Sequence, residues 1–404
     1  MMAKGQGRVG WVAVLTFALA LPWSIAGAGL LPPFLVLLAI IAFPVDARFW
    51  RRPRALSMPL VFGGLFLAWV GISFLWSPYD NPEQLPKTLI GIPLYILLVL
   101  RIAGLRGSWQ VRTEASMIFL VIALGLFLLA ESLTGGAMTY AFKVAVEGYD
   151  TLPEADVMIY VNRGLGHATV PLLLLAGPVA LIAYRAGGLV VGVVVMLLAA
   201  VAAFSFDTEV NSAAFVFGTI AATVTAFWPR RAIAGLFGFV AGGIMIVPVV
   251  LPGLIAAIPP GLRDFLPLSW VWRLEIWTYV CELIRDKPLF GYGLDASRPL
   301  NSEMELAGYQ IERLPLHPHN ASLQVWLETG LIGAVLLSCA LIFLGGRIAS
   351  APRLSREQAI AAAWVLVTYV CLVIFSYGAW QEWHQAAAAM AAASVLFLGA
   401  RKPV

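Results

Sequence analysis

Twelve apolar runs, bounded by charged residues or by Pro/Gly clusters, most strongly constrain how this chain folds. About 20 apolar residues cross the hydrocarbon core of a bilayer as a helix, so each run predicts a membrane span. We place the runs near residues 9–27, 31–45, 58–76, 88–104, 115–133, 166–184, 188–205, 212–228, 232–251, 323–345, 359–378 and 384–400. Only 12% of the residues are charged, against about a quarter in soluble chains. The sequence therefore predicts an all-α polytopic membrane protein.

The distribution of Lys and Arg predicts the orientation of these spans. Seventeen of the 26 basic residues lie on the side shared with the N-terminus, together with only three acidic residues. Cytoplasmic loops carry the excess of basic residues, so both termini are predicted to be cytoplasmic. A cleaved signal peptide is the alternative for the first run, although the second run follows it at once.

Two predicted outer segments are long, and they divide the chain into three parts. Residues 1–251 hold nine spans and an outer loop at about 134–165, and residues 323–404 hold three more spans. Between them, residues 252–322 are the one segment large enough for a small, mainly helical outer domain. Within it WVWRLEIWTYVCELIRDKP predicts a helix and LFGYGLD predicts a turn.

Several function classes lack their signals in this sequence. The basic residues form no stripe, which argues against nucleic-acid binding. Three cysteines without paired spacing predict neither a disulfide framework nor a Cys-based metal site. The stretch around Gly291 and Gly293 follows no apolar strand, so we interpret it as a turn rather than a dinucleotide fingerprint.

The His-containing stretch before the tenth span is the most distinctive candidate site. His317 and His319 lie in HPHN, where Asn320 is a good helix N-cap, and Glu328 lies inside the start of the span. An imidazole can accept a hydroxyl proton at neutral pH, which makes His319 a candidate general base. A local structural role is one alternative. A zinc site is another, but its third ligand would have to be His384 or Glu328.

Arg273 is the candidate cation of the predicted outer helix, and Trp277 lies one turn later on the same face. A guanidinium holds phosphate oxygens through its planar fork of donors. The alternative is a surface arginine that pairs with Glu275 or Glu282.

The predicted location of these residues restricts the chemistry. A site outside the cytoplasm has no ATP or nucleotide sugar, so group transfer needs a substrate that arrives already activated. Lipid-linked diphosphate sugars meet this requirement, because cations can stabilise the leaving group while one base activates the acceptor hydroxyl.

Three motifs resemble the O-antigen ligase and polymerase superfamily, and most of all its ligase-type members from alphaproteobacteria. They are RLEIW (273–277), DKPLFGYG (286–293) and HPHNASLQVWLETGLIG (317–333). The resemblance covers about sixty residues in its specific part. The number of spans and the large outer loop before the tenth span agree with it.

This resemblance implies a GT-C-like fold and a metal-independent glycosyltransferase of the bacterial inner membrane, without a cofactor. It implies a glycan on undecaprenyl diphosphate as donor and the lipid A–core of lipopolysaccharide, or another glycan, as acceptor. His319 would be the base and Arg273 would hold the diphosphate, with inversion at the anomeric carbon. Residues expected to contact substrate are His317, Asn320, Trp277, Gly291, Gly293 and Glu328.

One departure from the superfamily concerns a second arginine. Many relatives carry a Ser-Arg pair where this chain has Asp207, Glu209 and no arginine. Arg163, before the sixth predicted span, is the candidate replacement. Asp207 and Glu209 would instead position an acceptor or pair with Arg163.

Three other functions remain open from the sequence, and a protein-glycosylating relative of the ligases is one of them. A polymerase would use the same donor, base and cations, with a second donor molecule as acceptor. A transporter is the alternative of another class, but transporters place their charged residues near the bilayer midplane. Here the ionisable residues lie at the outer ends of the spans, with Glu131 and Glu328 as the nearest exceptions.

Overall fold

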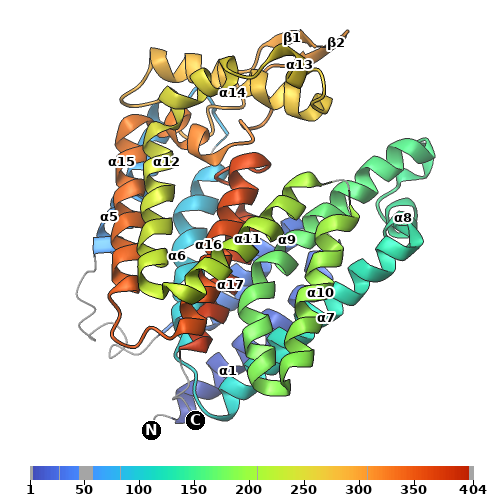
Figure 1. Ribbon diagram of the computed structural model, residues 1–404, viewed down its shortest axis with the longest axis vertical. Coiled ribbons are helices and arrows are strands. Elements are labelled where there is room, and N and C mark those ends of the chain that lie inside the picture. The colour runs from blue at the N-terminus through green and yellow to red at the C-terminus, as the bar shows by residue number, and fades with distance from the viewer. Residues whose placement is uncertain are drawn as a thin grey trace.

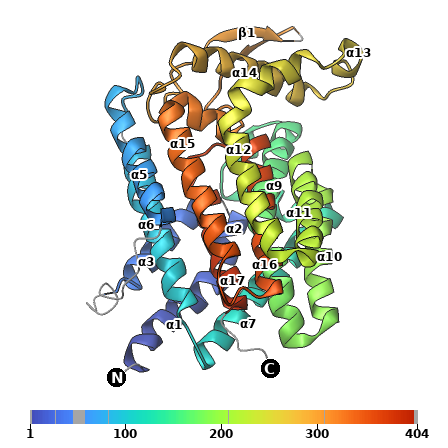
Figure 2. The same cartoon turned by 60° about the vertical axis from the view of Figure 1, so that its left-hand side comes forward.

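The computed structural model describes residues 3–26, 28–44, 58–81, 83–206, 208–306 and 308–399. Most of them lie in helices that run roughly along the long axis of the molecule (Figure 1). The two chain termini lie together at one end, and a smaller layer of short elements covers part of the other end (Figure 2). We call the end opposite the termini the cap end.

The helices and strands of the described ranges follow one another closely, apart from an irregular segment at residues 287–302. The first half contains α1 (Ala3–Ala18), α2 (Ala20–Ala26), α3 (Leu31–Ile41), α5 (Met58–Ser73), α6 (Gln84–Ala103), α7 (Ser108–Thr134), α8 (Ala137–Ala145) and α9 (Glu154–Gly187). The second half contains α10 (Leu189–Ser205), α11 (Glu209–Phe227), α12 (Pro229–Ala256), α13 (Pro260–Arg263), α14 (Leu268–Asp286), β1 (Glu303–Leu306), β2 (Tyr309–Glu312), α15 (Ala321–Ala349), α16 (Arg356–Phe375) and α17 (Glu382–Leu398).

The all-α polytopic fold predicted from the sequence is confirmed. Within the described ranges, nine helices are long and apolar enough to cross a membrane. The remaining three predicted runs coincide with the shorter helices α3, α10 and α17. The total of twelve spans stays a prediction.

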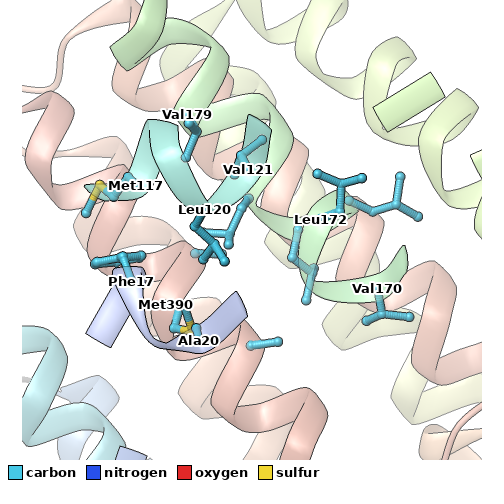
Figure 3. Packing of buried hydrophobic residues seen from close by; sticks show 14 of the residues in the cluster. Phe17, Ala20, Met117, Leu120, Val121, Val170, Leu172, Val179 and Met390 are labelled. Atoms are coloured by element: carbon cyan, nitrogen blue, oxygen red, sulfur yellow. The ribbon is translucent and has the colours of Figure 1, made fainter. Parts of the chain in front are cut away.

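Helix α9 forms the centre of the bundle. Its residues from 168 to 176 are all buried, so the helix is surrounded by protein on every side. Figure 3 shows Val170, Leu172 and Val179 of α9 among side chains of α1, α2, α7 and α17. This central helix is the frame on which elements at the cap end are placed.

The predicted start of the sixth span is wrong, because α9 begins at Glu154 rather than near residue 166. Glu154 and Asp156 occupy the first turn, where carboxylates stabilise a helix N-terminus. A search for apolar runs misses these polar turns. The consequence is that Arg163 lies inside a helix rather than in a loop.

The layer at the cap end consists of α13, α14 and the hairpin β1–β2, above the ends of α12 and α15 (Figures 1 and 2). The helix predicted within residues 252–322 is confirmed as α14. The antiparallel hairpin pairs Glu303 with Glu312 and was not predicted. Its four-residue strands carry several charges, and they give no apolar alternation long enough to recognise.

Candidate functional site

The HPHN turn leads into α15 at the cap end. Asn320 has extended backbone angles, and its side-chain oxygen accepts a hydrogen bond from the backbone N–H of Leu323 at 3.0 Å. The predicted helix N-cap is therefore confirmed. His319 has a φ of 53°, a left-handed conformation that few non-glycine residues adopt. This backbone conformation fixes the direction of the imidazole.

The imidazole of His319 is held on one side only. Its Nδ1 lies 2.6 Å from the backbone oxygen of Ser376. A carbonyl oxygen can only accept, so Nδ1 carries the proton and Nε2 is the basic atom. Within the described residues, Nε2 has no hydrogen-bond partner. Burial lowers the pKa of His319; the bond to Ser376 opposes this shift, while the charge of Arg273 adds to it. The ring is therefore neutral at pH 7.

His317 supports the turn in the opposite tautomer. Its Nδ1 accepts the backbone N–H of His319 at 3.2 Å, so its proton is on Nε2. That Nε2 lies 3.1 Å from the side-chain amide nitrogen of Gln381; turning this amide over brings its oxygen, which has no other partner in the described residues, into position to accept the proton. Burial, with the nearby His319 and Arg298, lowers the pKa of His317 to about 3. Both ring nitrogens are thus engaged.

Arg273 extends from α14 without a carboxylate partner. Its guanidinium carbon lies 5.2 Å from the centre of the Trp270 ring, and Nη1 donates to the Ser269 oxygen at 3.3 Å. Its Nε is buried and has no hydrogen-bond partner. Burial lowers the pKa of Arg273, with Glu209 and Tyr377 opposing the shift, and an arginine remains charged at neutral pH in either case.

The alternative that Arg273 pairs with Glu275 or Glu282 is wrong. Glu275 pairs with Arg263 at 2.6 Å, and Glu282 pairs with Arg313 at 3.6 Å. Within the described part of the chain, no carboxylate lies within 4.0 Å of the Arg273 guanidinium. Its donors therefore remain available for a ligand.

The start of α11 lies next to this arginine. Glu209 accepts a hydrogen bond from the indole nitrogen of Trp270, the residue whose ring lies beside Arg273. Glu209 thus faces Arg273 at longer range, and Arg163 is not its partner in the described residues. Asp207, the other predicted acidic residue here, lies outside the described residues.

Trp277 connects α14 to the HPHN turn. Its side chain is only 5% exposed, and its indole N–H donates to the backbone oxygen of Pro318 at 3.0 Å. This bond joins the helix that carries Arg273 to the turn that carries His319. The two predicted groups are therefore positioned by one shared contact.

Glu328 is the centre of a junction beneath this site. It is fully buried at 0% exposure. Its two oxygens accept hydrogen bonds from the Asp295 backbone N–H (2.8 Å), the Ser297 hydroxyl (2.6 Å), the Gln324 amide (3.0 Å) and the Trp380 indole (2.5 Å). Each donor on this list belongs to another segment or to another turn of α15. Glu328 therefore holds these segments in fixed positions relative to one another.

Gly291 and Gly293 are placed beside Glu328 by a break in α15. Gly330 has φ 65° and ψ −165° within that helix. The segment after α14 fills the break, because Tyr292 N–H binds the Leu327 oxygen and Gly293 N–H binds the Glu328 oxygen, each at 2.8 Å. A Cβ on Gly291 would lie 2.7 Å from the Glu328 backbone, so no larger residue fits. The turn predicted after α14 is confirmed.

The segment at residues 376–384, which comprises the loop after α16 and the first turn of α17, was missed as part of the site. It supplies the Ser376 oxygen to His319, the Gln381 amide to His317 and the Trp380 indole to Glu328. Its composition could have identified it from the sequence, because SYGAWQEWH, at the junction of the last two predicted spans, holds four aromatic or His residues.

Below this loop lies a cluster of aromatic rings and imidazoles. The centre of the His384 ring lies 4.0 Å from the centre of the Tyr377 ring and 3.9 Å from that of the Trp383 ring. His167 of α9 lies 5.7 Å from Tyr377 and 5.1 Å from Trp383, measured between ring centres. The loop therefore also contacts the central helix.

Arg163 lies apart from Arg273 and His319. It lines a cavity of about 240 Å³ between α2, α8 and α9, together with Lys143 and His167. The described residues provide no direct contact between this cavity and the HPHN turn. The connection is indirect, through His167 and Tyr377.

The arrangement around the HPHN turn suits base catalysis on an anionic substrate. A neutral imidazole with a free Nε2 can accept a proton, and an unpaired guanidinium can bind phosphate oxygens. Across the described residues, no three His, Cys, Asp or Glu side chains come together as a metal site requires. Of the predicted third ligands, Glu328 is engaged in the hydrogen bonds described above, whereas both ring nitrogens of His384 are buried without a hydrogen-bond partner in the described residues.

Comparison with known proteins identifies the same part of the chain. Residues 158–338 match the family described as O-antigen ligase. A Rickettsia conorii protein named "Putative polysaccharide ligase" is 36% identical over 115 residues, 28% of each chain. A Rickettsia bellii protein of the same name is 32% identical over 157 residues, 37% of this chain and 36% of its own length.

The similarity to these relatives is local. The chain matches about a quarter to just over a third of the length of the curated relatives. No solved structure matches significantly.

Proposed function

We propose that this chain, whose residues 158–338 match the O-antigen ligase family, is a glycosyltransferase of the bacterial inner membrane. It transfers a glycan from undecaprenyl diphosphate to a hydroxyl of the lipid A–core of lipopolysaccharide. Both termini are cytoplasmic and the HPHN turn faces the periplasm. The distribution of basic residues supports this orientation.

One observation carries the proposal. The turn that carries a neutral imidazole with an unoccupied Nε2 is joined through Trp277 to the helix that carries a guanidinium without a described carboxylate partner. The charge of Arg273 also lowers the pKa of His319, so the two groups lie within electrostatic reach of each other. An unpaired guanidinium and an imidazole without a partner on Nε2 lower the stability of the fold, so this arrangement is typical of a site where a substrate contacts both groups.

The reaction follows from these two groups. Nε2 of His319 takes the proton of the acceptor hydroxyl as its oxygen attacks the anomeric carbon of the donor sugar. The bond between that carbon and the diphosphate oxygen breaks, and undecaprenyl diphosphate leaves with the bonding electrons. Arg273 stabilises the developing charge on the diphosphate. Attack opposite to the leaving group inverts the anomeric carbon.

The test is a transfer assay with the purified full-length protein, a lipid-linked glycan donor and a separate lipid A–core acceptor. His319→Asn removes the base, yet asparagine also tolerates a positive φ. We expect transfer to fall about a thousandfold. Arg285→Ala is the control, since this exposed arginine of α14 binds only the Cys281 oxygen in the described residues.

Each product pattern has a defined meaning. Transfer to the core that His319→Asn abolishes and that a chelator leaves intact supports the metal-independent ligase. Donor glycans that lengthen without reaching the core would make the protein a polymerase. Wild-type protein that forms no covalent product would favour transport.

A further inference from the structure

The cavity that contains Arg163 has the character of a second binding site. It lies where α2, α8 and α9 meet, and its volume of about 240 Å³ exceeds that of a phosphate group. Arg163 stacks on Tyr160, with its guanidinium carbon 5.8 Å from the ring centre. No described carboxylate lies within ion-pair distance of Arg163.

A second cation lies in the same cavity. Lys143 extends from α8 across Gly164, where a Cβ would lie 3.7 Å from the lysine Cε. Its ammonium group pairs with Glu147 at 3.2 Å. The positive charges of Arg163 and Lys143 therefore face the single negative charge of Glu147 within the cavity. Such an excess favours an anion.

The surroundings indicate what kind of molecule carries the anion. Ile25, Ala26 and Phe142 line the cavity beside the charged groups. Ala26 ends one candidate span, and α9, which carries Arg163, is another. A cationic group with apolar neighbours at the end of spans fits the headgroup of an amphiphile. A free soluble anion would gain nothing from the apolar wall.

We propose that this cavity binds a phosphate group carried by a lipid or lipid-linked glycan, with Arg163 and Lys143 as its ligands. The proposal deepens the proposed function and rests on it only for the choice of lipids to test. Two sources share this chemistry: the phosphates of the lipid A–core acceptor and the diphosphate of the donor. The donor case corresponds to the role predicted for Arg163 from the sequence.

The position of the cavity relates it to the HPHN turn. His167, which lines the cavity, contacts the Tyr377 ring. The neighbouring Ser376 supplies the oxygen that binds His319. A lipid held by Arg163 would therefore be connected to the base through His167, Tyr377 and Ser376.

The experiment measures lipid binding to the purified full-length protein by native mass spectrometry. The probes are undecaprenyl diphosphate, lipid A–core, enzymatically dephosphorylated lipid A–core and phosphatidylglycerol. Arg163→Ala removes the unpaired cation. Gly164→Leu fills the cavity without changing its charge, at a helical position where a Cβ would make only an ordinary van der Waals contact with Lys143. Arg313→Ala is the control, because that arginine pairs with Glu282 far along the chain.

We expect Arg163→Ala and Gly164→Leu each to weaken binding of one phosphate-bearing lipid about tenfold or more. Glu147→Gln should strengthen it, because the carboxylate competes for Lys143. The affected lipid identifies the source: lipid A–core means the acceptor, undecaprenyl diphosphate means the donor, and phosphatidylglycerol means a bulk lipid. Arg313→Ala should bind all lipids as the wild type does.

Two results would overturn the proposal. One is unchanged affinity of both cavity variants for every phosphate-bearing lipid. The other is equal loss of phosphorylated and dephosphorylated lipid A–core, which would leave the phosphate without a role. His319→Asn separates this inference from the proposed function, since it should bind lipids normally although it is expected to be inactive in transfer.

Discussion

Two polar clusters of the same motif region differ in how fully their hydrogen-bonding groups are used. Around Glu328, both carboxylate oxygens are occupied by four donors from the surrounding segments. Around His319 and Arg273, an imidazole nitrogen and most guanidinium donors have no partner within the described residues. The two clusters are joined by the segment at residues 376–384, through Ser376 and Trp380.

This difference separates support from chemistry. A buried polar group that is fully paired rigidifies its surroundings, whereas an unpaired one is costly unless a ligand completes it. Glu328 therefore holds segments together, and His319 with Arg273 is left for substrate. Substitutions in the two clusters should accordingly affect different measurements.

Within this comparison, replacing Arg273 is expected to have the largest effect on the transfer rate. Arg273→Ala should lower the transfer rate about a hundredfold to a thousandfold, because one stabilising donor set for the leaving group is removed. Arg273→Lys should recover only part of the loss, since an ammonium lacks the planar fork. Initial rates at saturating acceptor measure this, and the midpoint of thermal unfolding should stay near that of the wild type.

Arg285→Ala tests whether any arginine of α14 matters in this way. It should leave the rate unchanged. If both arginine variants lose activity equally, the effect belongs to the charge of the helix rather than to Arg273.

A change at Glu328 should act mainly on stability. Glu328→Gln places an amide against donors that need an acceptor, which costs about 3 kcal/mol. The midpoint of thermal unfolding should fall clearly, while the rate per folded molecule changes less than the rate of Arg273→Ala. Glu131→Gln is the matched control, because Glu131 is also buried but accepts only the backbone N–H groups of Met138 and Thr139. A stable Glu328→Gln protein without activity would break the comparison.

Some features of these two clusters can be predicted from the sequence and others cannot. The helices, the N-cap at Asn320 and the candidate base follow from local patterns, which short-range chemistry determines. The same local patterns predict that α14 ends in a turn at its glycines. These features need no information about distant segments.

The partners of these residues could not be predicted because they come from far along the chain. His319 binds an oxygen at Ser376, and Glu328 binds the Trp380 indole. Such contacts depend on how α15, α16 and α17 pack, and no local pattern encodes that. The break at Gly330 has the same cause, because its φ is required by the segment after α14.

The pH dependence of transfer tests the electrostatic part of the site. Burial and the charge of Arg273 lower the pKa of His319 below its usual 6.5, and only the neutral ring is a base. The rate should therefore be constant above pH 6.5 and fall about tenfold per unit once the pH is below the pKa. In Arg273→Ala the residual activity should decline at a higher pH, because a cause of the lowered pKa is gone. If the transfer rate of the wild type already declines above pH 6.5, the pKa of His319 is not lowered by burial and by the charge of Arg273.

The smallest predicted effect concerns Trp277, which belongs to neither cluster but joins α14 to the HPHN turn. Trp277→Phe keeps an aromatic ring in the buried site and removes the hydrogen bond to the Pro318 oxygen, worth about 1 kcal/mol. We expect kcat to fall about fivefold, with little change in donor KM, because His319 is displaced while Arg273 still binds the diphosphate. Trp272→Phe is the control, since its indole binds the Glu312 oxygen in the hairpin, away from the turn. An equal loss in both variants would mean that Trp277 stabilises the layer at the cap end as a whole and does not align the base with the arginine.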